Sequence, residues 1–247
     1  MIDFYDNFAP YYDAWVSHDI LATELTQFYS DIISNTDSNT HVVYLGIATG
    51  RIAIEISKNN PYHHIIGIDS SHSMLQKCHN TFKNISKLEN ITLLNQDILK
   101  LKIDTQNNIY IMPFRTIGHF ITLKQKEIAL ISIHKTMQKD ELLIFDFDLL
   151  DELSAKKTNN QPHLSYHDET NGTIIYNKFN FNFVTQEIDV TVYQAIKKEE
   201  KLEDLVQHHY KFSWCSEAQI IKIVTEIGFK VINIEHFKMN RIFTLQK

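Results

Sequence analysis

Small residues and one acid, each beside a short apolar run, are the residues of this chain best suited to hold a nucleotide-like ligand. Gly46, Ala48 and Gly50 follow the first apolar run, and Asp69 ends the second. Glycine lets a ligand lie close against the backbone. If both runs are parallel strands, these residues share the carboxyl edge of a sheet, where open α/β sheets bind ligands. The pattern therefore predicts a nucleotide-type ligand.

The segment that carries these residues has the pattern of a β-α-β unit. Residues 42–45 and 65–68 are apolar and predict two strands, and the residues between them predict a helix. A dinucleotide site would need the spacing Gly-x-Gly-x-x-Gly. Arg51 occupies the position of the last glycine in that pattern, so the spacing argues against a dinucleotide.

The pattern Gly46-x-Ala48-x-Gly50, followed by Asp69, resembles motif I of the class I S-adenosylmethionine-dependent methyltransferases, usually acid-x-Gly-x-Gly-x-Gly. The resemblance implies S-adenosylmethionine as cofactor, S-adenosylhomocysteine as product, and Asp69 on the ribose hydroxyls. Tyr44 stands where the family usually has the acid that binds the cofactor's ammonium. Weaker binding is expected, because a neutral hydrogen bond contributes about 0.5–1.5 kcal/mol against ~1.5–3 for a charged one. The alternative is an α/β domain whose turn needs glycine only for its shape.

The same resemblance implies further cofactor contacts after the next strands. Ser70 and Met74 match the positions that frame the ribose and adenine in the family. Asp97 and Ile98 match the pair at the adenine amino group and ring face, although an aspartate after a strand is often only a cap. Met112, at the end of the predicted fourth strand, completes the expected set.

Two residues are candidates for catalysis. Residues 9–13 match a family segment that folds over the cofactor, which makes Tyr12 a site residue, although a helix core stripe explains it equally well. His119 lies in a segment after the fourth strand that resembles the corresponding loop of small-molecule N-methyltransferases, including aminosugar N,N-dimethyltransferases. Histidine suits a general base near neutral pH, so His119 is expected in that role, with His208 or His209 as second choice.

We therefore expect in-line methyl transfer to a small polar metabolite, and the resemblance around His119 favours an amine nitrogen over oxygen. The alternatives are an O-methyltransferase and a non-catalytic S-adenosylmethionine-binding regulatory protein. Enzymes that methylate nucleobase amines carry an Asn/Asp-Pro-Pro-aromatic motif. The corresponding residues here are Met112, Pro113 and Phe114, which lack the polar acceptor.

Composition limits the partners and the compartment. The 247-residue chain is 43% hydrophobic, which allows a full core, and its net charge of −6 argues against nucleic acid. No apolar stretch reaches the ~20 residues of a membrane span, and the first residues, MIDFYDNF, lack a signal peptide's features. A cytoplasmic protein without a membrane partner is expected.

Neither the cysteines nor the histidines predict a metal site. Cys78 and Cys215 are the only two cysteines and form no metal or disulfide framework. His163 and His167 lie in a strand-prone stretch that lacks the glutamate of a zinc helix.

The expected fold is α/β: a Rossmann-like, seven-stranded class I methyltransferase sheet with an antiparallel β insertion after strand five. Asn171-Gly172 between two strand patterns indicates a hairpin in that insertion. Because its aromatic residues would form an exposed face, the insertion is also a candidate homodimer surface. The expected parts are a helical N-terminal lid (1–40), a cofactor-binding core (41–159), the insertion as substrate cover (160–213), and a C-terminal helix and hairpin that complete the core (214–247).

Overall fold

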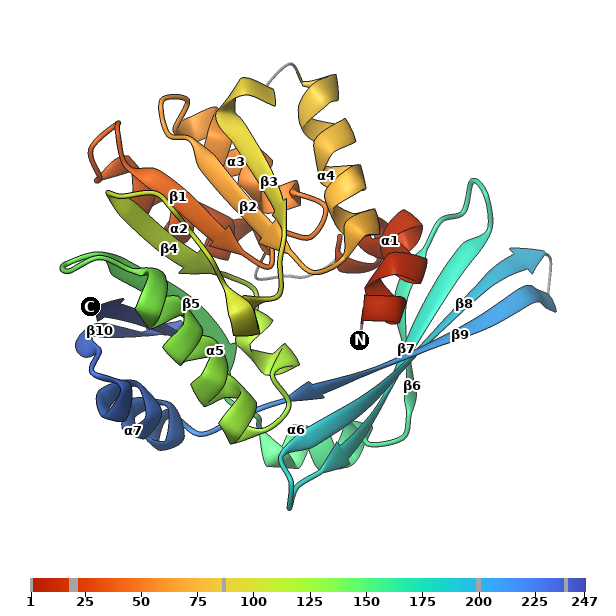
Figure 1. The fold of residues 1–247 in the computed structure, drawn as a ribbon. Helices are drawn as coiled ribbons and strands as arrows, with labels where there is room; N and C mark the ends of the chain where they lie inside the picture. The colour runs from red at the N-terminus through yellow and green to blue at the C-terminus, as the bar shows by residue number, and fades with distance from the viewer. Residues whose placement is uncertain (1, 18–21, 86–87, 199–200, 238–239) are drawn as a thin grey trace.

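The computed structural model describes residues 2–17, 22–85, 88–198, 201–237 and 240–247 and has two β-sheets. The larger sheet has seven strands in the order β10-β11-β5-β4-β1-β2-β3 (Figure 1). Its strands are β1 (His41–Leu45), β2 (Ile65–Asp69), β3 (Ile91–Asn95), β4 (Asn108–Met112), β5 (Leu142–Asp148), β10 (Lys230–Phe237) and β11 (Asn240–Gln246). The first five are parallel, and β11 pairs antiparallel with β5. The expected fold class is confirmed.

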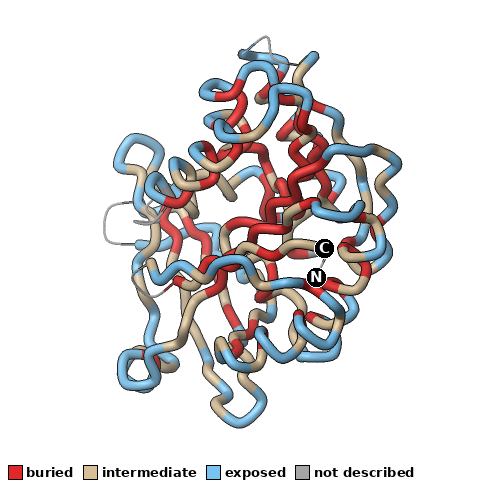
Figure 2. The backbone as a smooth tube through the Cα atoms, turned by 90° about the vertical axis from the view of Figure 1, so that its left-hand side faces the viewer, coloured by how far each residue is buried: buried red, intermediate tan, exposed pale blue. Residues whose placement is uncertain are grey.

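Helices cover both faces of this sheet. On one face lie α2 (Ala22–Ser34), α3 (Arg51–Asn59) and α4 (His72–Asn84), and on the other α5 (Leu123–Thr136) and α7 (Glu217–Ile227). Alternate residues of one strand serve the two faces: Val42 packs under α3, and Val43 packs under α5. Burial on both faces explains the continuous apolar runs in the sequence, and Figure 2 shows the buried backbone gathered in the interior.

The second sheet is antiparallel and follows α6 (Glu152–Thr158). Its strands are β6 (Pro162–His167), β7 (Thr173–Asn182), β8 (Glu187–Lys198) and β9 (Lys201–Ser213), in that order. Phe181 and Phe183, two aromatic residues of the insertion, pack against Trp214 at ring-centroid distances of 6.2 and 5.9 Å. These rings are therefore partly covered by their own chain.

The expected N-terminal lid contains two helices with different neighbours. Leu25, Tyr29 and Ile33 of α2 are fully buried in the core on the α3 side of the large sheet. By contrast, α1 (Ile2–Val16) lies between α4 and the second sheet. There Phe4 and Phe8 pack against the inner face of β7 and β8. α2 thus packs with the core of the large sheet, whereas α1 packs with α4 and the second sheet.

Short 3₁₀ helices complete the connections, at Leu88–Asn90 (η1), Ile98–Lys100 (η2) and Thr116–His119 (η3). In the part of the chain that the structure describes, no helix has the length and apolar character needed to cross a membrane.

The N-terminus of α7 provides a stability test. Ser216 Oγ accepts the Gln219 N–H at 3.2 Å, and the Gln219 side chain accepts the Ser216 N–H at 2.7 Å. We expect Ser216→Ala to lower the free energy of unfolding by about 1 kcal/mol, and Ser216→Gly by only a few tenths, because an exposed glycine N-cap lets water replace the hydroxyl. Urea denaturation would measure both, and equal losses would contradict this account of the cap.

Candidate functional site

The loop between β1 and α3 has a backbone that larger residues would disturb. Gly46 and Gly50 have φ values of 76° and 79°, in the left-handed region that favours glycine. A Cβ at Gly46 would lie 2.7 Å from Thr116 Cγ2, and one at Gly50 would lie 2.5 Å from Cys78 Sγ. The two glycines are therefore required both by the turn and by close packing on either side.

Asp69, at the end of β2, joins this loop to the start of α4. Its Oδ2 accepts the Ala48 N–H at 2.9 Å, and its Oδ1 accepts the Ser71 N–H, also at 2.9 Å. Burial raises the pKa of Asp69, and the hydrogen bonds from these backbone groups oppose that shift. The carboxylate is thus fixed where the glycine loop and α4 meet.

The N-terminal end of α4 also holds α1. Ser71 Oγ caps α4 by accepting the Met74 N–H at 3.2 Å, and it donates to Asp6 Oδ1 at 2.5 Å. The same Asp6 oxygen accepts the Ser73 N–H at 3.1 Å. Asp6 therefore lies at the positive end of the α4 dipole, where a carboxylate is favoured.

A second acid of α1 binds the glycine loop directly. Asp13 Oδ1 accepts from Thr49 Oγ1 at 2.5 Å, and its Oδ2 lies 2.8 Å from Lys77 Nζ of α4. Lys77 also donates to the Ala9 carbonyl at 3.0 Å. These side chains are about one third exposed, so the ion pair contributes little by itself, but together the contacts hold α1 across the edge of the sheet.

Another buried acid, Asp146 of β5, positions the loop that leads to η3. It is fully buried and accepts the Tyr29 hydroxyl at 2.6 Å, the Phe114 N–H at 2.8 Å and the Arg115 N–H at 3.0 Å. Phe114 and Arg115 have φ values of 57° and 61°, which side chains disfavour. Burial raises the pKa of Asp146 to about 6. This carboxyl stabilises a strained turn below the cavity.

His119 ends η3 in an aromatic environment. Its Nε2 lies 3.0 Å from Tyr5 Oη, and its ring centroid lies 5.0 Å from that of Phe212 and 6.1 Å from that of Tyr210. Burial, and to a smaller extent the positive charges of Lys126 and Arg115, lowers the pKa of His119 to about 4. The imidazole is therefore uncharged at neutral pH and is a much weaker base than the sequence suggested.

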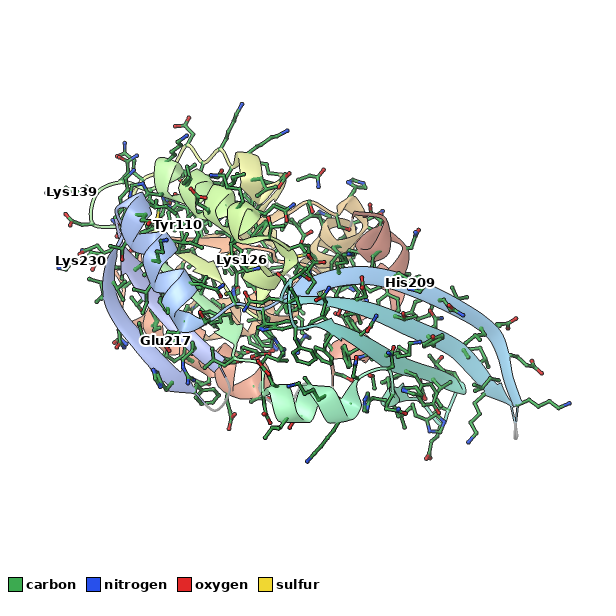
Figure 3. The ribbon with its side chains drawn as sticks, turned by 90° about the horizontal axis from the view of Figure 1, so that it is seen from below. Tyr110, Lys126, Lys139, His209, Glu217 and Lys230 are labelled. Atoms are coloured by element: carbon green, nitrogen blue, oxygen red, sulfur yellow. The ribbon has the colours of Figure 1, made fainter. Side chains whose placement is uncertain are left out.

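Lys126 of α5 (Figure 3) is buried beside the end of η3. It is 1% exposed, and its Nζ donates to the Phe120 carbonyl and, at 2.5 Å, to Ser213 Oγ. Ser213 in turn donates to the Gly118 carbonyl at 3.0 Å. Burial lowers the pKa of Lys126 to about 8. The contacts join η3 to α5 and to the end of β9.

These elements enclose a cavity of about 300 Å³ beneath α1. Tyr5 and Tyr12 of α1, the glycine loop, and Asp69 with the start of α4 line it, and so do residues near η2 and η3. A concave site of this size with a few convergent polar groups is the usual form of a small-molecule site.

The comparisons with known proteins identify the family. A model described as a methyltransferase domain matches residues 36–208, well over half of the chain. The chain belongs to the methyltransferase domain family. It is 29% identical to carboxy-S-adenosyl-L-methionine synthase of Ruthia magnifica subsp. Calyptogena magnifica over 108 residues. The matched stretch is 43% of this chain and 44% of that protein. This methyltransferase thus spans under half the length of that curated relative.

Solved structures agree on the fold. An S-adenosylmethionine-dependent methyltransferase from Clostridium acetobutylicum has a TM-score of 0.77 at 16% identity and covers 98% of each chain. CalS10, an amino pentose methyltransferase from Micromonospora echinaspora bound to S-adenosylmethionine, has a TM-score of 0.69 at 10% identity and covers 90% of each. The fold is that of the S-adenosylmethionine-dependent methyltransferases, and S-adenosylmethionine, the expected cofactor, is the cofactor of this family.

The cavity of the methyltransferase contains most of the residues selected from the sequence. Those that line it are Tyr12, Gly46, Ala48, Asp69, Ser70, Met74, Asp97, Ile98 and His119. Two others do not line it: Gly50 faces Cys78 below the loop, and Met112 is fully buried in the core under α5. Because side chains alternate along a strand, the Met112 side chain points toward α5 and away from the cavity.

The alternative histidines lie elsewhere. His208 packs against Phe8 with ring centroids 5.1 Å apart, and His209 is exposed on β9. Neither lines the cavity. Tyr12 lines the cavity, and its ring also packs against that of Trp15, with centroids 6.0 Å apart.

Among the cavity residues that the sequence patterns did not indicate are Arg51 and Tyr5. Arg51 was noted only because it replaces a glycine; its guanidinium carbon lies 5.5 Å from the centroid of the Phe114 ring. Its Nε is buried and has no hydrogen-bond partner among the described residues. Tyr5 lies in the aromatic N-terminal segment, where no spacing distinguished it from its neighbours.

The lowered pKa of His119 predicts a change in acid stability. Between pH of about 4 and 6.5 the unfolded chain binds a proton at this residue and the folded chain does not, so stability falls as the pH drops through this window. His119→Gln should remove up to about 3 kcal/mol of that loss at pH 4. Urea denaturation at several pH values would measure it.

Two further variants serve as controls. His209→Gln, at an exposed position, should leave the pH profile unchanged. Asp146→Asn should change the pH profile in the opposite direction. The raised pKa of Asp146 contributes stability at low pH that is lost as the pH rises from about 4 to 6, and the variant removes that loss. Parallel profiles for the wild type and His119→Gln would show that His119 titrates normally.

Proposed function

We propose that this methyltransferase transfers a methyl group from S-adenosylmethionine to an amine nitrogen of a small polar metabolite, within the cavity beneath α1. One observation carries the proposal: the glycine loop and Asp69 line the same cavity as uncharged hydrogen-bonding side chains of α1 and η3. We assign the first group to a cofactor end and the second to an acceptor end. When bound, the cofactor supplies a methyl group that its sulfonium makes electrophilic.

The residues at the first end suit the nucleoside part of the cofactor. Asp69 uses each oxygen for one backbone N–H and keeps further lone pairs for two ribose hydroxyls. Ser70 and Met74 lie next to it along the cavity, and Asp97 and Ile98 line the same wall. Asp97 also caps η2, since its Oδ1 accepts the Leu99 N–H at 2.9 Å. Because Asp97 lines the cavity as well, the cap is compatible with the proposed adenine contact.

Arg51 suits the carboxylate of the methionine part. Tyr44 replaces the usual acid and lines the cavity, buried to 3% exposure. With no acid at that position, the guanidinium of Arg51 is the charged group near it, and a guanidinium binds carboxylates well. We propose that this chain holds the methionine part more through its carboxylate than through its ammonium.

A double comparison tests Arg51. For the wild type, we expect S-adenosylhomocysteine to bind about 10- to 100-fold more tightly than its decarboxylated analogue, as for a charged hydrogen bond. For Arg51→Met the two ligands should bind within about threefold of each other. Lys58→Met, at an exposed position on the same helix, is the control and should keep the difference. Calorimetry measures all six affinities. If Arg51→Met keeps the wild-type difference in affinity between the two ligands, Arg51 does not bind the cofactor's carboxylate.

The acceptor end favours nitrogen over oxygen. Asp69 and Asp97 are the acids that line the cavity, and both belong to the proposed cofactor end. His119, with a pKa of about 4, cannot readily take a proton from an ammonium: against an amine pKa of ~10.4 the transfer is uphill by roughly 9 kcal/mol. A hydroxyl acceptor would need a stronger base than this end offers. A neutral amine needs none, because its lone pair is already free to react.

The chain's own contribution is therefore alignment. Tyr5, which lines the cavity with Tyr12 and His119, has its ring centroid 6.1 Å from that of Tyr12 and 5.4 Å from that of His119. Contacts with α4 and the glycine loop fix α1. Holding the two reactants in line supplies up to ~7–11 kcal/mol in well-oriented systems. CalS10, which shares the fold, is named for an amino pentose, and an aminosugar is accordingly the first acceptor class to test.

The experiment is a transfer assay with methyl-labelled S-adenosylmethionine against aminosugars, their hydroxyl analogues and metabolite extracts. We expect label on an amine nitrogen, and a rate that rises with pH up to the pKa of the acceptor amine. His119→Gln should lower kcat by about 10- to 100-fold, because it removes a positioned hydrogen bond, and should leave that pH midpoint unchanged.

The outcomes separate the alternatives. Label on oxygen would make the protein an O-methyltransferase. Cofactor binding with no transfer to any extract would make it a binding protein. A pH midpoint that moves in His119→Gln, but not in the control His209→Gln, would restore His119 as the general base.

A further inference from the structure

Tyr5 and His119 come from distant parts of the chain and meet in the cavity. Tyr5 belongs to α1, and His119 ends η3, yet the Tyr5 hydroxyl and His119 Nε2 are 3.0 Å apart. Their rings are nearly perpendicular, at 85°, with centroids 5.4 Å apart. Both residues line the cavity, so the pair is a single hydrogen-bonded unit at the acceptor end.

The histidine has no nitrogen open to an acceptor in this arrangement. Nε2 is engaged by Tyr5, and Nδ1 is buried with no hydrogen-bond partner among the described residues. Phe212 closes the site from behind: a Cβ on Gly118 would lie 2.1 Å from the Phe212 Cζ atom. The His119 ring itself is held between Phe212 and Tyr5, with centroids 5.0 and 5.4 Å away, which restricts its turning.

The tyrosine oxygen, by contrast, remains available. If His119 carries its proton on Nδ1, the Tyr5 hydroxyl donates to Nε2 and keeps two lone pairs. If the proton is on Nε2, the Tyr5 oxygen accepts it and keeps one lone pair and its own proton. Under either tautomer, the Tyr5 oxygen can accept an N–H from a ligand in the cavity.

The position of Tyr5 is linked to the cofactor end of the site. Asp6, the next residue, accepts from Ser71 Oγ and from the Ser73 N–H at the start of α4. Ser71 also donates its N–H to Asp69. One short series of hydrogen bonds therefore sets the distance between Asp69 and the Tyr5 hydroxyl.

We propose that the Tyr5 hydroxyl oxygen is the group that contacts the methyl-accepting nitrogen, and that His119 is a positioning residue behind it. The inference rests on the proposed function. The acceptor's N–H donates to Tyr5 Oη. This hydrogen bond directs the lone pair of the acceptor nitrogen along the cavity. That lone pair forms the new N–C bond, and the electrons of the broken S–C bond stay on sulfur. The methylated nitrogen is then an ammonium that still carries its protons. It loses one of them to water after the product leaves the site.

The test uses two defined ligands and so needs no identified acceptor. Both are analogues of S-adenosylhomocysteine with nitrogen in place of sulfur; one carries a 2-aminoethyl arm on that nitrogen and the other a propyl arm. In the wild type we expect the amine arm to bind about 10- to 100-fold more tightly, as for a charged hydrogen bond. Tyr5→Phe should reduce this preference to below about threefold, and its affinity for S-adenosylhomocysteine should stay unchanged.

Further variants separate contact from positioning. His119→Gln should reduce the preference less than Tyr5→Phe does, and the double variant should resemble Tyr5→Phe alone, because the two residues act as one unit. Tyr11→Phe, a tyrosine of the same helix that does not line the cavity, should keep the full preference. Circular dichroism would confirm that each variant is folded.

Each result decides between stated alternatives. Equal binding of both arms by the wild type, or a preference that persists in Tyr5→Phe, would overturn the role of Tyr5. A preference lost in His119→Gln but kept in Tyr5→Phe would make His119 the contact. If S-adenosylhomocysteine itself does not bind the wild type, the proposed function fails, and that failure is distinct from failure of this inference.

Discussion

The hydrogen bonds that Asp69 accepts from Ala48 and Ser71 connect the parts of the site. One fixes the glycine loop after β1, and the other fixes the first turn of α4. Through Ser71, the same group reaches Asp6 and so α1. Because α1 carries Tyr5 and Tyr12, the cavity wall that α1 forms is positioned by contacts that begin at Asp69.

A second carboxyl has the corresponding role at another strand end. Asp146 of β5 holds the turn at Phe114 and Arg115 in the left-handed region, and η3 with His119 follows directly. The parallel sheet thus presents two acids at its carboxyl edge, Asp69 partly buried and Asp146 fully buried, and each stabilises the loop of a neighbouring strand. In a low-dielectric setting, such fully hydrogen-bonded groups fix one arrangement of a loop.

Much of this could be predicted from residue patterns, because the relevant signals are local. The apolar runs, the capping box at Ser216, and the pairing of Gly46 with Asp69 all lie within short segments. The contact of Tyr5 with His119 spans 114 residues, and nothing in either segment points to the other. The same holds for Asp146, whose partners come from α2 and from the loop after β4.

Burial explains the remaining differences. His119 lies close to its expected place, but its aromatic surroundings lower its pKa and change what it can do. Met112 lies at the end of a strand as expected, but its side chain points into the core. In both residues, chemistry depends on tertiary packing, which the order of motifs along a chain does not encode.

The central claim is that Asp69 both organises the site and binds the cofactor. Calorimetry of S-adenosylhomocysteine with the wild type, Asp69→Ala and the exposed control Asp189→Ala tests it most directly. The account predicts a loss of about 1–3 kcal/mol or more for Asp69→Ala, as for a lost charged acceptor, and no loss for the control. Unchanged affinity in folded Asp69→Ala would contradict it.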